Sequence, residues 1–192
     1  MKPLLSIVLI LLAAVCGHAQ LVITNVFDGP LTGGTPKGVE LYAISNINDL
    51  SEYGIASANN GEGSSGIPEF TFPVASVPAG SYIYVATEEP NFTAFFGFAP
   101  DYVDAVCNIN GDDAIEVYHN GSVIDVFGEV DVDGTGQPWE YLDGWASRVA
   151  ETGPDGSTFN LSNWIFSGVD ALDNSVTNET AESPVPIQTY SG

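Results

Sequence analysis

Three observations predict an all-β fold, an antiparallel sandwich or barrel. Short runs rich in β-branched and aromatic residues recur along the chain, and such runs at regular spacing are typical of antiparallel β folds. Many of the 21 glycines and 12 prolines lie between these runs, where turns need them. Asn120-Gly121 separates two alternating runs. This pair is the strongest short-range hairpin signal, because a type I′ turn needs a positive φ at both central residues.

The elements follow from residue alternation and from the glycine and proline breaks. Residues 48–53 and 91–96 are each predicted to form one or two helical turns before a glycine, and residues 56–66 a flexible loop. Residues 169–192 are polar and lack a clear strand, so they either wrap the surface or trail as a linker. The predicted strands are 21–27, 38–43, 69–72, 82–86, 114–118, 122–127, 145–149 and 163–166.

The predicted hairpin raises an electrostatic question. With Asn120-Gly121 as the loop, Val117 faces Ile124 and Glu116 faces Asp125. Like charges directly opposite each other destabilise a sheet. We therefore expect Arg148, a metal ion, a proton, or water in an altered register to neutralise the two carboxylates.

Residues 1–19 read as a secretory signal peptide. Lys2 gives a positive start, residues 4–14 are apolar, and small residues precede the expected cleavage position. Cys16 raises the alternative of a lipoprotein signal, but Val15 stands where such signals usually carry Gly or Ala. The chain is therefore expected to be secreted, extracellular or at a cell surface, without membrane insertion.

The charge balance limits the partners. The chain has 25 Asp and Glu against 3 Lys and Arg, and removal of the leader would leave only Lys37 and Arg148. Binding to a nucleic acid backbone depends on basic side chains, so we exclude nucleic acid as a direct partner. The acidity indicates either solubility in a salty medium or cation binding. Cys107, the one cysteine after the leader, is expected to be a buried thiol in a β-like run.

Several motifs, taken in order, resemble the lamin tail domain family. They are KGVELY (37–42), GDDAIEVY (111–118), NG (120–121) with VIDVFG (123–128), WASRV (145–149), GPDG (153–156) and NW (163–164). The resemblance implies an antiparallel immunoglobulin-like β-sandwich with short helical connections over residues 20–168, followed by the polar segment 169–192. It also implies a non-catalytic binding or attachment module of bacterial extracellular proteins, whose partner is an extracellular protein or a polysaccharide. Two departures from the family pattern are the long loop 44–72 and residues 167–173, which replace a Pro-Gly close.

Catalytic residues are scarce. His119 is the only histidine outside the leader and flanks a turn, and neither a Gly-x-Ser-x-Gly elbow nor a His/Cys zinc cluster is present. Paired carboxylates suffice for a glycosidase, so a hydrolase using Glu116 and Asp125 is the third hypothesis. We expect no enzyme activity.

A calcium-dependent carbohydrate-binding module is the alternative function. Asp131, Asp133 and Thr135 place oxygen ligands at alternate positions before a glycine, like the first half of an EF-hand loop. Asp143 lies near the end of such a loop, although position twelve is Leu142 rather than Glu. No other cofactor is expected, and the competing reading is a polar loop without metal.

Two further groups are assigned roles from the sequence. Trp139 and Tyr141 stand on one face of an extended segment and are a possible stacking platform for a sugar, or else they close the edge of the sandwich. Arg148, as almost the only guanidinium, is expected to form a structural charge network with Glu116, Asp125 and Glu40. The candidate site residues predicted from the sequence are Asp131, Asp133, Thr135, Asp143, Trp139, Tyr141, Arg148, Glu116, Asp125 and Glu40.

Overall fold

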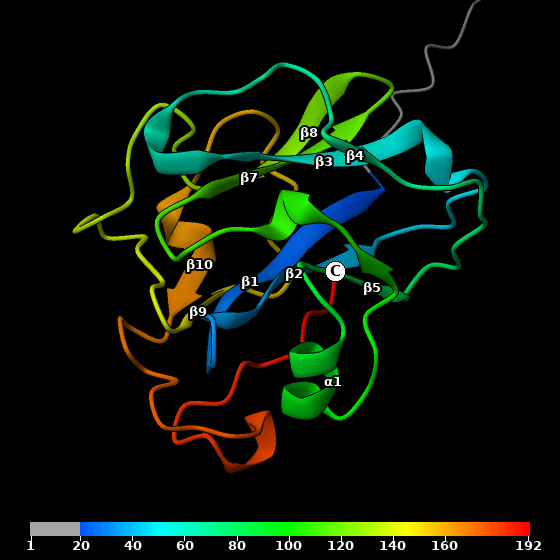
Figure 1. The fold of residues 1–192 in the computed structure, drawn as a ribbon. Coiled ribbons are helices and arrows are strands. Elements are labelled where there is room, and N and C mark those ends of the chain that lie inside the picture. The colour runs from blue at the N-terminus through cyan, green and yellow to red at the C-terminus, as the bar shows by residue number, and fades with distance from the viewer. Residues whose placement is uncertain (1–19) are drawn as a thin grey trace, which may run out of the picture.

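The computed structural model describes residues 20–192, and within them ten strands form two sheets (Figure 1). The predicted leader, residues 1–19, lies outside the described residues. The six-stranded sheet has the order β10 (Trp164–Phe166), β9 (Trp145–Arg148), β1 (Leu21–Leu31), β2 (Thr35–Ala43), β5 (Tyr82–Ala86) and β6 (Tyr102–Val103). The four-stranded sheet has the order β4 (Phe70–Thr71), β3 (Tyr53–Ala58), β7 (Ala114–His119) and β8 (Ser122–Phe127). The predicted all-β sandwich is confirmed.

Pairing is antiparallel throughout the described strands except between β5 and β6, which run parallel. Helix α1 (Pro90–Phe96) and the loop after it separate these two strands, which gives the chain room to cross over before it pairs in the same direction. The prediction of a purely antiparallel arrangement is corrected at this one edge.

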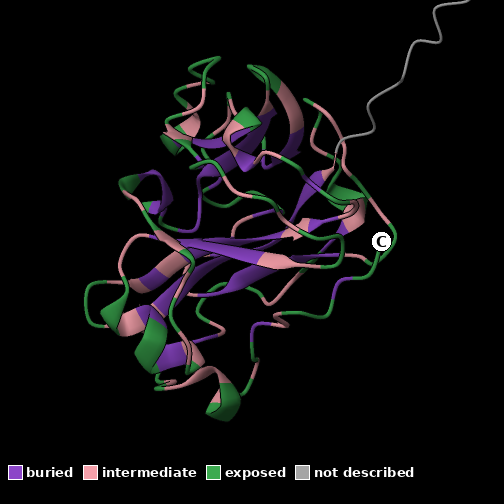
Figure 2. Cartoon of the chain, turned by 90° about the vertical axis from the view of Figure 1, so that its right-hand side faces the viewer, coloured by how far each residue is buried: buried purple, intermediate pink, exposed green. Residues whose placement is uncertain are grey.

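The main core fills the space between the sheets. Alternation along β2 turns Val39, Leu41 and Ala43 inward, and all three are fully buried, as a strand with one core face requires. From the other sheet, Ile115 and Val117 on β7 meet them in the same cluster. Figure 2 shows buried residues along the central strands and exposed residues mainly in the loops and turns.

A second apolar cluster covers the outer face of the six-stranded sheet. Tyr84 and Trp145 on the sheet pack with Phe92 of α1 and with Leu172 and Val185 of the C-terminal segment. Residues 169–192 therefore wrap the sandwich, which settles the choice left open by their composition. Figure 1 shows α1 and the first part of this segment below the sheets, with the chain then rising to the C-terminus beside β2 and β5.

Strand β3 was missed because its sequence, YGIASA, is small and carries a glycine. Gly54 is required there, since a Cβ would lie 2.6 Å from the Phe70 carbonyl oxygen and from Pro68. Strand β3 pairs with β4 on one side and with β7 on the other. Residues 56–58, assigned to a flexible loop from composition, thus belong to a central strand.

The two predicted helical turns are confirmed. Helix α1 ends at Gly97 with φ 83°, and the 3₁₀ turn η1 (Leu50–Glu52) begins after Asp49, whose side chain accepts from the backbone N–H of Ser51. Other 3₁₀ turns are η2 (Asn59–Gly61), η3 (Ala105–Cys107), η4 (Leu161–Asn163) and η5 (Asn178–Thr180).

Cys107 lies in η3 rather than in a strand. It is buried as expected, and burial raises the pKa of its thiol.

The β7–β8 hairpin forms at the predicted turn but not in the predicted register. Asn120 and Gly121 have φ of 48° and 75°, as a type I′ turn needs. Beyond Tyr118↔Val123 the register shifts, so that Val117 pairs with Asp125. Ile124 is the extra residue of a β-bulge, and the predicted facing of Glu116 and Asp125 is wrong.

Candidate functional site

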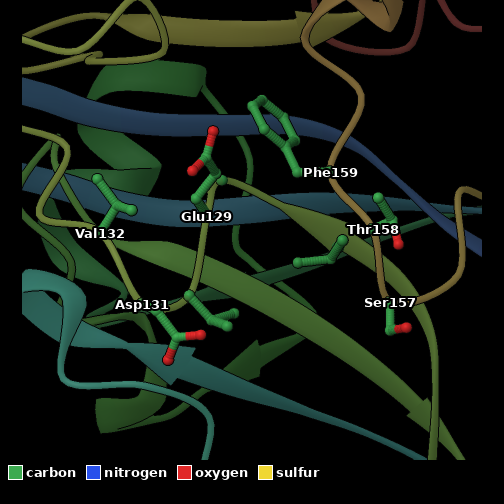
Figure 3. Close-up of a pocket in the computed structure, with 9 residues that line it drawn as sticks. Glu129, Asp131, Val132, Ser157, Thr158 and Phe159 are labelled. Carbon is green, nitrogen blue, oxygen red and sulfur yellow. The ribbon is translucent and has the colours of Figure 1, made fainter.

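An open pocket of about 360 Å³ lies beside β8, the edge strand of the four-stranded sheet. Its lining comes from the end of β8, the loop after it and the segment before β10: Val126, Gly128, Glu129, Val130, Asp131, Val132, Ser157, Thr158 and Phe159. Figure 3 shows Ser157, Thr158 and Phe159 along one segment, with Glu129, Asp131 and Val132 on the loop opposite.

Two backbone contacts hold the 155–159 segment along β8. The N–H of Gly156 donates to the Ile124 carbonyl oxygen at 3.1 Å. The N–H of Asp155 donates to Oδ1 of Asp125 at 2.9 Å. The bulge at Ile124 therefore helps to position the wall of the pocket.

The apolar wall is continuous with the core. The Phe159 ring lies with its centroid 5.5 Å from that of Phe127 and 6.2 Å from that of Trp139. Val126 is 2% exposed. The wall is thus fixed by packing.

The polar side of the pocket carries two free carboxylates. Glu129 and Asp131 are exposed, and neither side chain forms a hydrogen bond or an ion pair within residues 20–192. A Cβ on Gly63 would lie 3.1 Å from Oδ1 of Asp131, so a side chain at position 63 would crowd this carboxylate. The pocket therefore offers an apolar wall facing unpaired negative charge.

The predicted Arg148 network exists in part. Nη2 of Arg148 lies 2.8 Å from both oxygens of Asp125, Nη1 lies 2.7 Å from Asp155, and Nε donates to the Ile23 carbonyl oxygen at 2.6 Å. The guanidinium also lies 4.5 Å from the centre of the Trp164 ring. Burial raises the pKa of Asp125 to about 6, although Arg148 acts to lower it.

Glu40 does not belong to this network, contrary to the prediction. It is fully buried on the outer side of the six-stranded sheet. Its carboxylate accepts hydrogen bonds from Thr24, Asn25, Tyr84 and the backbone N–H of Gln188, at 2.6–2.8 Å. Four donors satisfy this buried charge without a cation, and the bond from Gln188 anchors the C-terminal segment.

Glu116 is also separate from Arg148. Its Oε2 accepts from the hydroxyls of Ser64 and Tyr118, and burial raises the pKa of Tyr118 to about 12. Because the bulge turns Asp125 to the inner face, the acid pair on which the hydrolase hypothesis depends is not formed.

The predicted calcium ligands are not brought together. Asp133 accepts from the backbone N–H of Thr135 at 2.9 Å, which lowers the pKa of Asp133, while the Thr135 hydroxyl donates to Asp112. Asp131 faces the pocket instead. Within the described residues Asp131, Asp133 and Asp143 do not meet in one group of carboxylates, and the calcium half-site of this loop stays a prediction.

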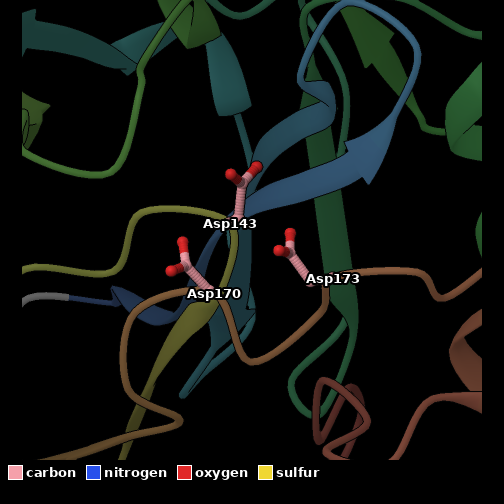
Figure 4. A group of neighbouring side chains, drawn as sticks. All are labelled: Asp143, Asp170 and Asp173. Carbon is pink, nitrogen blue, oxygen red and sulfur yellow. The ribbon is translucent and has the colours of Figure 1, made fainter.

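Asp143, the fourth predicted ligand, lies elsewhere. One carboxylate oxygen from each of Asp143, Asp170 and Asp173 lies within 4.8 Å of the others (Figure 4). Burial, followed by the charges of Asp173 and Asp170, raises the pKa of Asp143. The sequence missed this group because the last two residues belong to the C-terminal segment, whose path was open.

The predicted sugar platform is also overturned. Trp139 and Tyr141 are 2% and 0% exposed, and both rings pack edge-on against Phe127. The Tyr141 hydroxyl donates to the Asp113 carbonyl oxygen. These aromatics belong to the core, the alternative weighed from the sequence, and cannot stack on a ligand.

His119 is the only histidine among the described residues, and its environment is structural. Its ring stacks on Tyr53 with centroids 4.4 Å apart, and Nε2 lies 3.3 Å from Glu52.

The pocket residues Glu129, Ser157, Thr158 and Phe159 were missed by sequence reasoning. Only the GPDG motif before them pointed to that segment.

Comparisons of the chain with protein-family models, with curated proteins and with solved structures give no match. In the described part of the chain, no helix has the length and apolar character needed to cross a bilayer.

Proposed function

We propose that the chain is a secreted, non-catalytic binding or attachment module of the lamin tail domain type, with an immunoglobulin-like sandwich. The observation that carries the proposal is the open pocket beside β8, with its fixed apolar wall and two unpaired carboxylates. Pockets that combine apolar lining with a few polar groups are the usual places for ligands.

The positions of the family-like motifs support the proposal. KGVELY forms most of β2, GDDAIEVY and VIDVFG belong to the β7–β8 hairpin, and WASRV contains β9. The motifs thus form strands of both sheets around one core. The pocket lies at the end of the hairpin motif.

The placement of reactive groups favours binding over catalysis. Arg148, Glu116 and Glu40 are buried and hydrogen-bonded to the fold. These three groups hold the sandwich together and are not available for general acid–base chemistry, which requires groups that converge in a cleft.

A binding and turnover assay on the same immobilised materials tests the proposal. The purified protein would be applied to extracellular proteins and to insoluble polysaccharides, with bound protein and released products both measured. Retention that saturates, without product release, is the expected result. Release of sugars or peptides at a rate that scales with protein concentration would overturn it.

A further inference from the structure

The charges of the described surface are almost all negative. Six of the 25 Asp and Glu residues are buried, and the other 19 lie at least partly at the surface. Both basic side chains of residues 20–192 are held in ion pairs: Lys37 with Asp28 at 3.0 Å, and Arg148 with Asp125. Any basic side chain that meets an exposed carboxylate of the described chain, His119 aside, must therefore come from a partner.

The loop that carries the two pocket carboxylates is held in place. The N–H of Val132 donates to the Glu129 carbonyl oxygen, and the N–H of Gly63 donates to the Val130 carbonyl oxygen, both at 3.0 Å. A Cβ on Gly61 would lie 2.4 Å from the backbone nitrogen of Asp133, so the two loops are in close contact. Glu129 and Asp131 are thus presented from an ordered turn.

The pocket combines the features that a long basic side chain needs. Lysine and arginine bury an aliphatic stem on apolar surface and keep the charged head in a polar setting. Val130 and Phe159 offer the apolar surface, and Glu129 and Asp131 offer the negative charge. The hydroxyls of Ser157 and Thr158 lie on the opposite wall (Figure 3).

We propose that this pocket receives a lysine or arginine side chain from a basic, extended segment of a protein partner. The inference rests on the proposed binding function and names the class of its ligand. Charge complementarity selects this occupant, because the anionic surface attracts and orients basic segments and disfavours acidic ones.

The first test is a titration followed by NMR. Capped peptides of glycine and serine with one central lysine, arginine or norleucine would be added to the isotopically labelled protein. Norleucine keeps the aliphatic stem and lacks the charge. Lysine and arginine peptides are expected to shift the amide signals of residues 126–132 and 157–159, with the norleucine peptide binding about tenfold more weakly or worse.

Two double variants with equal charge change separate the pocket from general attraction. Glu129→Gln with Asp131→Asn is expected to raise the Kd for the lysine peptide about tenfold. Glu179→Gln with Glu182→Gln, both exposed on the C-terminal segment, is the matched control and should change it by less than about twofold. Thermal midpoints equal to that of wild type would show that both variants fold.

Four results would overturn the inference. Equal weakening in the two double variants would mean non-specific attraction, and equal binding of norleucine and lysine peptides would remove the cation. Binding of 1,5-diaminopentane as tightly as the peptide would assign the pocket to a free amine. If no basic peptide binds while a polysaccharide or another protein is retained without turnover, this inference fails and the proposed function stands.

Discussion

The guanidinium of Arg148 on β9 and the carboxylate of Asp125 on β8 form an ion pair between the two sheets, with Nη2 at 2.8 Å from each carboxylate oxygen. Both side chains are fully buried. Asp125 also accepts from the N–H of Ile23, and Arg148 donates to the carbonyl oxygen of the same residue. The pairing of β1 with β2 is irregular just after Ile23, and the ion pair satisfies the backbone groups there.

Arg148→Ala is expected to lower the free energy of unfolding by about 3–5 kcal/mol at neutral pH, because it leaves Asp125 buried without its cation. The measurement is the urea unfolding midpoint at pH 7, with the slope checked for a change in the denatured state. An unchanged midpoint would show that the ion pair does not stabilise the sandwich.

Replacing both partners is the informative control. Arg148→Met with Asp125→Leu removes the two charges together, so neither is left unpaired. This double variant is expected to recover a large part of the loss, since apolar replacements of buried pairs are often neutral or stabilising. A double variant as unstable as Arg148→Ala would assign the loss to the partners that remain, the backbone groups of Ile23 and the carboxylate of Asp155.

Gly153 lies against the guanidinium and gives a second measurement of the same network. A Cβ there would lie 2.4 Å from Nη1 of Arg148, and φ is 76°. Gly156 has a similar φ of 68° with nothing within 4 Å of a Cβ. Gly156→Ala is expected to cost about 1 kcal/mol for the left-handed backbone, and Gly153→Ala clearly more. Equal midpoints in urea would mean that Arg148 moves aside without cost.

The hairpin shows how much of the fold could be predicted. Asn120-Gly121 identified the turn, because few residue pairs accept a positive φ twice. Strand spacing could not reveal the extra residue Ile124, since a bulge changes the register without a distinct sequence signal. Because basic residues are scarce, the sequence correctly predicted that Arg148 pairs with Asp125. It could not show that Glu40 lies outside this network, where four neutral donors bind its carboxylate.

The candidate site could not be predicted from the sequence for a related reason. Glu129 and Phe159 are thirty positions apart and meet only because the 155–159 segment follows the edge of β8. The loop that contains Trp139 looks polar and open in sequence, yet its aromatics pack around Phe127. The composition of a loop therefore does not show which of its side chains pack into the core.

The stability of the protein is expected to rise as the pH falls from about 7.5 to 5. Burial raises the pKa of Asp28 and of Asp125 from 3.8 to about 6. Over the pH range from 5 to 7.5 the two carboxyl groups therefore bind more protons in the folded state than in the unfolded state. The free energy of unfolding then decreases as the pH increases. Urea midpoints measured from pH 8 to 5 test the direction, and a flat or reversed profile would contradict it.

Asp28→Asn isolates one contributor to this pH dependence. The variant lacks the buried titrating group and should show a shallower slope between pH 7 and 5, whatever its absolute stability after the loss of the Lys37 pair. Glu179→Gln, at an exposed position, is the control and should retain the wild-type slope. Identical slopes in all three proteins would mean that Asp28 does not contribute to the pH dependence.

The three carboxylates Asp143, Asp170 and Asp173 predict a response to divalent cations. Their oxygens lie within 4.8 Å of one another, so they repel when ionised. Two of them belong to the C-terminal segment that covers the outer sheet face. Relief of this repulsion should stabilise the attachment of that segment, by a cation that binds the folded state or by removal of one charge.

Asp173→Asn is therefore expected to melt at a higher temperature than wild type in the presence of a chelator. Millimolar calcium chloride should raise the midpoint of wild type more than sodium chloride of equal ionic strength does, and should raise that of the variant less. Asp133→Asn, in the loop that closes on its own hydrogen bonds, is the control and should keep the wild-type calcium response. If calcium and sodium act equally on all three proteins, the cluster is only a patch of screened surface charge.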